Sequence, residues 1–353
     1  MAFSLPDLNE LHDLPFDTII DVRSPSEYAE DHVPGAINLP VLSDAERAQV
    51  GTIYKQVSAF RARKLGAALV AKNAARHLEG ALAEMDGGWR PLVYCWRGGQ
   101  RSGSFASILA QIGWRVEVLD GGYRSYRRAV VERLYERPLG RSVVLLDGLT
   151  GTGKTDVLLE VGRRGRAVLD LEGLANHRGS VLGPCEGGQP SQKAFETALI
   201  EALVGAHGNT PLLVEAESSK VGDLLVPPAI WNAMRDAPRI RLEAPEAARA
   251  TYLARTYADV ASDPAGLVQL LAKLVPHVGR SVVDQWSALA RAGEHRALAL
   301  DLIQRHYDIR YNTGKAPAPR AQVTVALDRD GIVAAADAVC SELDALAPEA
   351  LLA

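Results

Sequence analysis

One glycine-rich loop constrains the fold of this chain more than any other feature. Residues 142–147 (SVVLLD) form a short apolar run, and residues 148–155 (GLTGTGKT) follow it directly. This loop matches the pattern G-x-x-x-x-G-K-[ST], which requires a strand before it and a helix after it. The following residues, 154–162, have helical character. We therefore expect an α/β domain with a phosphate-binding loop at the carboxyl end of a strand.

Similar alternation extends over most of the chain. Short apolar runs that predict strands alternate with stretches of helical pattern, such as 44–86 and 102–111. This order predicts mostly parallel sheets covered by helices. The expected strands are 16–22, a short strand after a turn within 33–40, 91–94 and 114–119 in the first half, then 142–147, 166–171, 211–215 and 239–243.

A break in the pattern divides the chain. Pro138, Leu139 and Gly140 form a hinge-like turn between the two halves. We predict a domain over residues 1–137 with a parallel sheet, and a doubly wound domain over 138–353 that ends in a helical region. A chain of 353 residues is long enough for two domains that each bury a core.

Composition limits the function classes. Hydrophobic residues make up 47% and charged residues 23%, as in ordinary globular proteins. The net charge of −4 argues against a strongly cationic nucleic-acid protein, although a local basic face would suffice for binding. Three cysteines form no disulfide framework, and neither a signal peptide nor a membrane-length apolar run is visible. We expect a cytoplasmic protein with no membrane partner.

A second candidate anion site follows the strand 91–94. Cys95 begins the loop CWRGGQR, which has the spacing C-x5-R. Gly98 and Gly99 allow several backbone N–H groups to converge, and Arg97 and Arg101 add charge. These groups would favour the thiolate and bind a tetrahedral anion. Cys95 is therefore the candidate catalytic nucleophile, although a buried cysteine at a strand end can be purely structural.

The glycine-rich loop supplies its own candidates. Its backbone N–H groups would cradle a diphosphate, its lysine would reach the outer phosphates, and its final threonine could hold Mg²⁺. The residues concerned are Gly148, Gly151, Thr152, Gly153, Lys154 and Thr155. The pattern predicts diphosphate or nucleotide binding, not hydrolysis.

Polar residues after the neighbouring strands could complete that site. Glu215 and Glu217 follow an apolar strand, and Glu172 ends another, so any of them could support a metal ion; each could instead cap a helix or form an ion pair. No metal site is firm, and no tightly bound cofactor is predicted. Further candidates in polar segments, for which a solvated loop is the alternative, are Asn176, His177, Arg178 and Gln192.

The first domain resembles the rhodanese family. The matching pieces are residues 20–28 (IDVRSPSEY), 32–38 (HVPGAIN), 94–95 and 118–122 (VLDGG). The resemblance covers about residues 10–130 and implies a rhodanese-like domain whose loop cysteine carries sulfur or selenium. The loop departs from the common sulfurtransferase form, because C-x5-R is the length found in cysteine phosphatases on this fold. The longer loop leaves room for a phosphate-sized anion.

The chain to about residue 311 resembles the tRNA 2-selenouridine synthases, in which a P-loop NTPase-like domain follows a rhodanese domain. The resemblance rests on residues 44–47, 50–56, 94–102, 148–155, 171–180, 189–192, 217–218 and 306–308. Ser219-Lys220 departs from the family, which often has an arginine there. The resemblance implies that wobble 2-thiouridine of tRNAs for Lys, Glu and Gln is the substrate. Geranyl diphosphate would alkylate its sulfur, and selenium from selenophosphate would then displace geranylthiol.

A division of roles fits the two loops. The P-loop would hold geranyl diphosphate, and the Cys95 loop would bind selenophosphate, with Cys95 acting as a thiolate or a selenium-loaded species. Arg124, Arg127 and Arg128 are candidates for tRNA phosphates, as are Arg163, Arg164 and Arg166, although both groups could be solvated helix faces. The alternatives are a cysteine phosphatase or sulfurtransferase fused to a P-loop small-molecule kinase, and a non-enzymatic RNA-binding or sulfur-carrier protein. The sequence does not indicate the oligomeric state.

Overall fold

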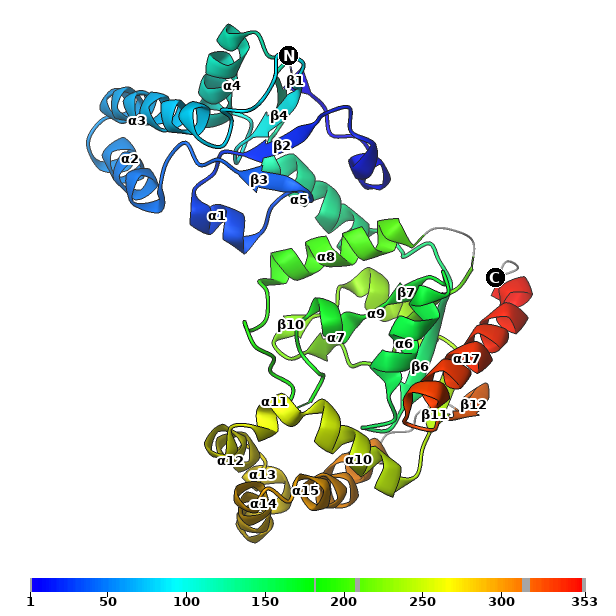
Figure 1. The fold of residues 1–353 in the computed structure, drawn as a ribbon. Helices are drawn as coiled ribbons and strands as arrows, with labels where there is room; N and C mark the ends of the chain where they lie inside the picture. The colour runs from blue at the N-terminus through cyan, green and yellow to red at the C-terminus, as the bar shows by residue number, and fades with distance from the viewer. Residues whose placement is uncertain (1, 181, 207–209, 313–317, 351–353) are drawn as a thin grey trace. The chain divides into compact units, whose positions relative to one another are not determined.

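The structure, a computed structural model, describes residues 2–180, 182–206, 210–312 and 318–350 (Figure 1). It divides into two compact units. One contains the chain up to Glu136 together with 190–204, and the other contains 137–189 with the chain from Gly205 onward. The stretch 190–204 therefore packs with the first unit, although it lies within the sequence range 138–353 expected for the second domain.

The first unit is built on a parallel five-stranded sheet with the order β1-β5-β4-β2-β3. Its central strand β4 is buried along its whole length, as expected for a parallel strand covered on both faces. Asp21 pairs in register with Tyr94, so the end of β2 lies beside the residue before Cys95. The strands are β1 Ala2–Phe3, β2 Thr18–Asp21, β3 Ala36–Asn38, β4 Pro91–Tyr94 and β5 Glu117–Leu119.

Helices lie on both sides of this sheet (Figure 1). Ser24 is the N-cap of α1, where Ser24 and Glu27 form a capping box. The helices are η1 Leu8–Asp13, α1 Pro25–Glu30, α2 Asp44–Gln56, α3 Ala59–Glu79, α4 Gln100–Ile112, α5 Tyr123–Val131, the π-helical turn η2 Glu132–Glu136 and α8 Gln192–Gly205.

A second parallel sheet, with the order β12-β11-β6-β8-β7, forms the centre of the other unit. Leu146 of β6 pairs in register with Glu215 of β8, so this carboxylate lies beside the strand that leads into the P-loop. The strands are β6 Val143–Gly148, β7 Val168–Leu169, β8 Leu212–Glu215, β11 Arg239–Glu243 and β12 Ala321–Thr324; β9 Lys220–Val221 and β10 Leu224–Leu225 form a separate antiparallel pair.

Two kinds of helix accompany this sheet. α6 and α17 pack on each other and share a core with β6, β8 and β11, whereas the segment between β11 and β12 forms a helical region with its own core around Trp286. The helices are α6 Lys154–Arg163, α7 Leu171–Leu174, α9 Pro228–Arg235, α10 Glu246–Thr256, α11 Ala258–Ala261, α12 Pro264–Ala272, α13 Val275–Val278, α14 Arg280–Ala292, α15 His295–Leu302, η3 Ile303–Tyr307, α16 Asp308–Asn312 and α17 Arg329–Ala350.

The predicted α/β class is confirmed, and the expected strands are present, several with shorter ends, while β6 extends to Gly148. The edge strand β12 was not expected, because its sequence (AQVT) has no distinctive apolar run. No helix within the described part of the chain is long and apolar enough to cross a membrane.

Candidate functional site

Cys95 lies directly after β4, at the base of a tightly folded loop, and is only 3% exposed. The loop is braced by the start of α5, where the Tyr123 N–H donates to the Cys95 carbonyl oxygen at 2.8 Å. Gly122 makes this approach possible: its φ is +60°, and a Cβ added there would lie 2.3 Å from the same carbonyl oxygen. The glycine pair at 121–122 is thus part of the architecture of the cysteine loop.

The surroundings of Cys95 favour its thiolate. Burial alone would raise the pKa of Cys95, but hydrogen bonds from the Ser102 side chain and from the backbone N–H groups of Ser102 and Arg97 act in the opposite direction. The positive charge of Arg101 adds to them, and the net pKa lies below its usual value. The Ser102 hydroxyl donates to the sulfur at 3.2 Å. Ser102 was not among the predicted site residues; its position one turn into α4 is the signal that could have identified it.

The two arginines of this loop differ in their environment. The Arg101 guanidinium donates to Glu27 at 2.8 Å, and Glu27 also pairs with Arg47 at 2.8 Å. Burial of Glu27 opposes its ionisation, yet Arg101 and Arg47 hold the pKa of this carboxyl below its usual value. Arg101 is therefore oriented by a carboxylate within electrostatic reach of Cys95, whereas Arg97 is exposed.

Gly98 and Gly99 complete the predicted anion cradle. Gly98 has a φ of +66°, and an added Cβ would lie 2.7 Å from the Leu119 carbonyl oxygen, so this turn also requires glycine. Gly99 is the N-cap of α4, without a side-chain cap. The positive end of this helix is therefore free to interact with an anion held by the loop.

The P-loop runs from the end of β6 to the start of α6. Gly151 and Gly153 have φ values of +85° and +76°, and an added Cβ at Gly151 would lie 2.9 Å from Leu253. Thr152 Oγ1 donates to the Leu149 carbonyl oxygen at 2.8 Å, and Lys154 Nζ donates to that of Gly148 at 3.0 Å. Thr155 follows in the first turn of α6. The six predicted residues thus form one compact loop at a helix N-terminus.

A buried ion pair supports this loop from behind. Arg249 on α10 is 1% exposed and donates to both carboxylate oxygens of Asp308, at 3.0 and 2.6 Å. The same guanidinium donates to the Thr150 carbonyl oxygen at 3.2 Å. Arg249 was missed by the sequence reasoning because nothing in the local sequence links α10 to residue 308 or to the P-loop.

Three carboxylates meet close to the P-loop. Glu215 is fully buried and accepts from the Glu172 N–H, while its other oxygen has no partner. Burial and the neighbouring charge of Glu172 raise its pKa. Burial, then repulsion and hydrogen bonding with Glu217, raise the pKa of Glu172 to about 8, partly offset by Lys154. Glu172 therefore retains its proton at neutral pH.

A protonated carboxyl group is a poor ligand for the Mg²⁺ ion expected at the P-loop. Within the described residues, no group of three or more His, Cys, Asp or Glu side chains is placed to hold a metal ion. Mg²⁺ in such sites is usually held by few protein groups, several waters and substrate phosphates. Thr155 and a bound diphosphate would thus be the main ligands of Mg²⁺. Binding of Mg²⁺ at this loop stays a prediction.

The polar loop after α7 is held mainly by internal contacts. Asn176 has a φ of +46° and donates to the carbonyl oxygens of Glu186 and Gly188, both at 2.8 Å. Burial lowers the pKa of His177, which accepts from the Gly179 N–H. Arg178 pairs with Asp259 at 2.8 Å and lies 4.7 Å from the centre of the Tyr257 ring. These residues shape the loop beside Glu172.

Gln192 is the first residue of α8. It belongs to the segment that packs with the first unit, and its amide donates to Glu196 at 2.9 Å. The structure therefore gives Gln192 a contact within the first unit, and its role at the second site stays a prediction.

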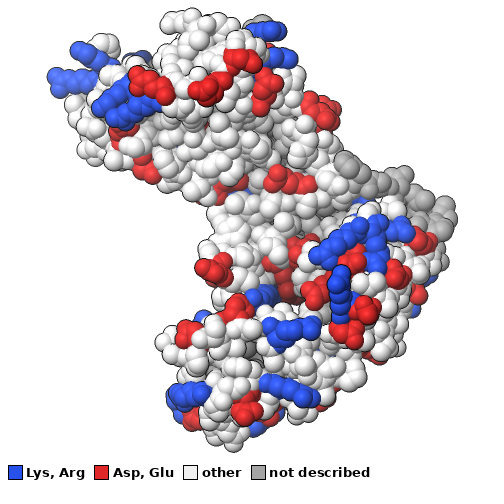
Figure 2. All heavy atoms as spheres, viewed as in Figure 1, with Lys and Arg blue, Asp and Glu red and all other residues white. Residues whose placement is uncertain are grey.

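The predicted tRNA-binding arginines differ in exposure, and several of them already pair with carboxylates. Arg124 and Arg128 are exposed on α5. Arg127 pairs with Glu196, which is 1% exposed, so its charge is already matched within the protein, and its contact with tRNA stays a prediction. The second group is also paired: Arg163 and Arg164 contact Glu160, Arg164 also contacts Asp337, and Arg166 contacts Asp344. Figure 2 shows basic and acidic side chains interspersed over α6 and α17.

Comparisons with known proteins agree with this architecture. Residues 4–129 match the model of the rhodanese-like domain, and residues 141–273 match that of the tRNA 2-selenouridine synthase AAA domain. Proteins named tRNA 2-selenouridine synthase are similar over most of the chain. That of Shewanella loihica is 40% identical over 68% of this chain and 64% of its own length, slightly under two thirds.

This chain matches a larger share of the length of two further relatives. The Nitrosomonas europaea protein is 33% identical over 75% of this chain and 69% of its own length, and that of Hahella chejuensis is 36% identical over 84% and 73%. Among solved structures, the N-terminal domain of a putative ATP/GTP binding protein from Clostridium difficile 630 is 34% identical and covers 37% of this chain and all of its own. Its TM-score of 0.33 is too low to support a structural argument.

Proposed function

The chain belongs to the tRNA 2-selenouridine synthase family, and we propose that it converts wobble 2-thiouridine in tRNA into 2-selenouridine. The observation that carries this proposal is the presence of two separate anion-binding loops, one with a low-pKa thiol and one a P-loop, in a member of this family. Two such sites fit a two-stage reaction that uses two different phosphate-bearing co-substrates.

The first stage takes place at the P-loop. The loop backbone and Lys154 hold the diphosphate of geranyl diphosphate, as residues 148–155 are suited to do. The thiouridine sulfur attacks the first carbon of the geranyl group, the carbon–oxygen bond breaks, and pyrophosphate leaves. The uridine N3–H loses its proton, so the product is the neutral S-geranyl nucleoside. Fixed N–H groups and Lys154 stabilise the departing charge.

The second stage takes place at the Cys95 loop. Backbone N–H groups, the N-terminus of α4 and Arg101 hold the phosphate of selenophosphate. Selenium replaces geranylthiol at C2 of the base, and hydrolysis of the selenium–phosphorus bond leaves 2-selenouridine and phosphate. Selenophosphate supplies selenium at the selenide level, so this exchange needs no oxidant. A stored perselenide would need one, and this difference favours Cys95 acting as a thiolate.

The tRNA is recognised through its anticodon loop. We propose tRNAs for Lys, Glu and Gln, whose wobble base lies in a single-stranded loop and needs no helix opening. Arg124 and Arg128 are exposed on α5 and would contact phosphates of the tRNA, giving a salt-dependent affinity.

Mass spectrometry of nucleosides tests the proposal. Thiolated tRNA is incubated with the protein, geranyl diphosphate and selenophosphate. We expect Cys95→Ser to accumulate the S-geranyl nucleoside without selenation, and Lys154→Ala to lose geranylation. Cys185→Ser serves as the matched control. Unchanged 2-thiouridine with the unmodified protein under all conditions would refute the proposal, and loss of geranylation in Cys95→Ser would refute the division of roles.

The C-x5-R loop and the lowered Cys95 pKa also fit a cysteine phosphatase. That alternative predicts steady release of phosphate from a small aryl phosphate, abolished in Cys95→Ser. Assaying the same preparations for this activity separates the two functions.

A further inference from the structure

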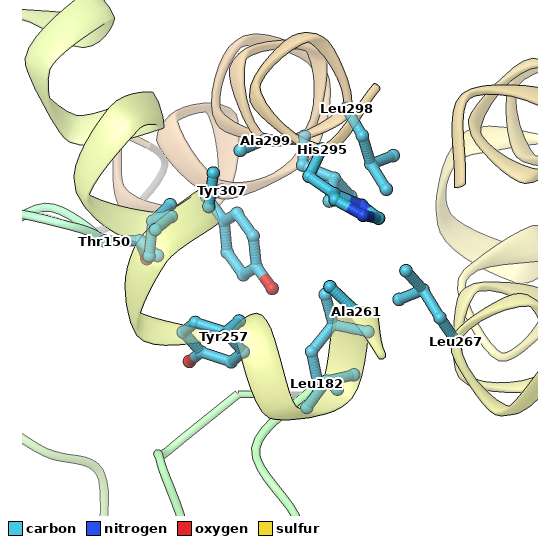
Figure 3. A pocket seen from close by; sticks show the side chains of 13 residues that line it. Thr150, Leu182, Tyr257, Ala261, Leu267, His295, Leu298, Ala299 and Tyr307 are labelled. Carbon is cyan, nitrogen blue, oxygen red and sulfur yellow. The ribbon is translucent and has the colours of Figure 1, made fainter. Parts of the chain in front are cut away.

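The second unit contains an apolar pocket that the two-loop scheme does not use. It contains about 520 Å³ of space free of protein atoms, part of which is open to solvent. Its lining comes from α10, α11, α12, α15 and η3, together with Leu182 and Thr150. Figure 3 shows Tyr257, Tyr307, His295 and Leu298 arranged around one space. A concave surface lined mainly by apolar side chains is typical of a small-molecule site.

This pocket is continuous with the P-loop. Thr150 belongs to the loop and also lines the pocket. Leu253 lines the pocket, and its side chain lies so close to Gly151 that an added Cβ would be 2.9 Å from it. Arg249, on the same helix α10, donates to the Thr150 carbonyl oxygen. A ligand whose diphosphate occupies the loop would therefore have the rest of the molecule at the pocket.

The chemistry of the lining selects the rest of that molecule. None of the lining residues that the structure describes is Lys, Arg, Asp or Glu; most are aliphatic, and the polar groups are limited to Thr150, Tyr257, Tyr307 and His295. A nucleoside would bury ribose hydroxyls and base nitrogens with few partners, which is unfavourable. A hydrocarbon chain has no such groups and gains from leaving water.

We propose that this pocket binds the hydrocarbon chain of a diphosphate ester whose head group occupies the P-loop. The inference rests on the proposed function, which names geranyl diphosphate, and it adds the residues that select the chain. The P-loop thereby binds a prenyl diphosphate rather than a nucleotide, because the adjoining pocket accepts carbon and not a nucleoside.

Chain-length discrimination gives the expected magnitude. Geranyl diphosphate has five more carbons than dimethylallyl diphosphate, and each buried methylene contributes roughly 0.8 kcal/mol. Complete burial of these carbons corresponds to about a thousandfold in affinity, so we expect a preference on the order of 10²- to 10³-fold. Inorganic pyrophosphate, which has only the head group, reports on the P-loop alone.

Calorimetric titration of the full chain with these three ligands tests the pocket. Ala261 lines it at the end of α11, and Ala261→Phe would fill it. Ala258, at the start of the same short helix, is exposed, so Ala258→Phe is the matched control. We expect Ala261→Phe to lower the affinity for geranyl diphosphate at least tenfold and to change the affinity for pyrophosphate by no more than twofold. Ala258→Phe should bind both ligands like the unmodified protein.

A second variant covers the case in which Ala261→Phe does not fold. Val260→Thr is nearly isosteric and adds one hydroxyl to the lining, so we expect several-fold weaker geranyl diphosphate binding with unchanged pyrophosphate binding. Equal geranyl diphosphate affinity in the variants and the controls overturns the pocket assignment. Tight, chain-selective binding without any alkylation of tRNA overturns the proposed function and leaves the pocket in place. Geranylation at the normal rate in Ala261→Phe overturns the pocket assignment and leaves the proposed function in place.

Discussion

The buried pair between Arg249 and Asp308 offers the sharpest test of how the P-loop is supported. Asp308→Asn removes the charge and keeps the shape of the side chain. Arg249, at 1% exposure, would keep its charge with only the neutral amide oxygen and the Thr150 carbonyl oxygen as partners. Its Nε has no hydrogen-bond partner even in the intact pair. The variant should therefore destabilise the second unit.

The size of the effect follows from the contacts. The pair has two charge-assisted hydrogen bonds, of 3.0 and 2.6 Å, and breaking a buried ion pair costs about 3–5 kcal/mol. Asn retains one acceptor, and the 16% exposure of Asp308 allows some hydration, so we expect the lower end, about 3 kcal/mol. For a unit of this size, that corresponds to a fall in melting temperature of about 6–12 °C.

Thermal denaturation followed by circular dichroism measures this change. Asp344→Asn is the control, because Asp344 pairs with Arg166 at an exposed site, and we expect about 0–1 kcal/mol there. The double variant Arg249→Met with Asp308→Leu should recover stability, since apolar replacement of a buried pair is often neutral or favourable. It should still bind pyrophosphate roughly tenfold more weakly, because the Thr150 carbonyl oxygen loses its donor. A melting temperature of Asp308→Asn equal to that of Asp344→Asn would refute the reasoning.

Three further outcomes are expected. Ser102→Ala removes a hydrogen bond that lowers the Cys95 pKa, so the pH profile of Cys95 alkylation by iodoacetamide should move to higher pH; an unmoved profile would contradict this. The folded-state pKa of Glu172, about 8, lies above the usual value, so its ionisation reduces stability as pH rises from about 4.5 to 8. Glu172→Gln should melt higher than the unmodified protein at pH 8 and equally at pH 4, and a pH-independent difference would count against the raised pKa of Glu172. Gly122→Ala should destabilise the first unit by at least about 1–3 kcal/mol in urea denaturation, since φ is +60° and the Cβ would overlap the Cys95 carbonyl; Gly87→Ala, which has open space around it, is the control.

Much of the fold was predictable from short-range patterns. The strand before each anion-binding loop, the helix after it and the capping box at Ser24 depend on residues adjacent in sequence. The glycines at 98, 151 and 153 were predicted for the same reason, since each is required by the local turn. β12 was missed because a short edge strand depends on its neighbour β11 more than on its own sequence.

Long-range partners were not predictable in this way. Arg127 read as an exposed basic residue, but Glu196 neutralises it from α8. Arg249 carried no signal at all, and Asp308 was noted only as part of a family motif, because no spacing rule connects residues 249 and 308. Charge pairing of this kind depends on which elements pack together, and sequence periodicity does not contain that information.

The sequence by itself determined the two loops and their chemistry, because a phosphate cradle and a low-pKa thiol need particular residues at fixed local spacing. Only the tertiary structure decided what surrounds them. It aligned Glu215 with the end of β6, brought Arg249 behind Thr150, and assembled an apolar pocket from helices between β11 and β12 beside the P-loop. These arrangements follow from packing between residues far apart in the chain, where burial and shape determine the partner.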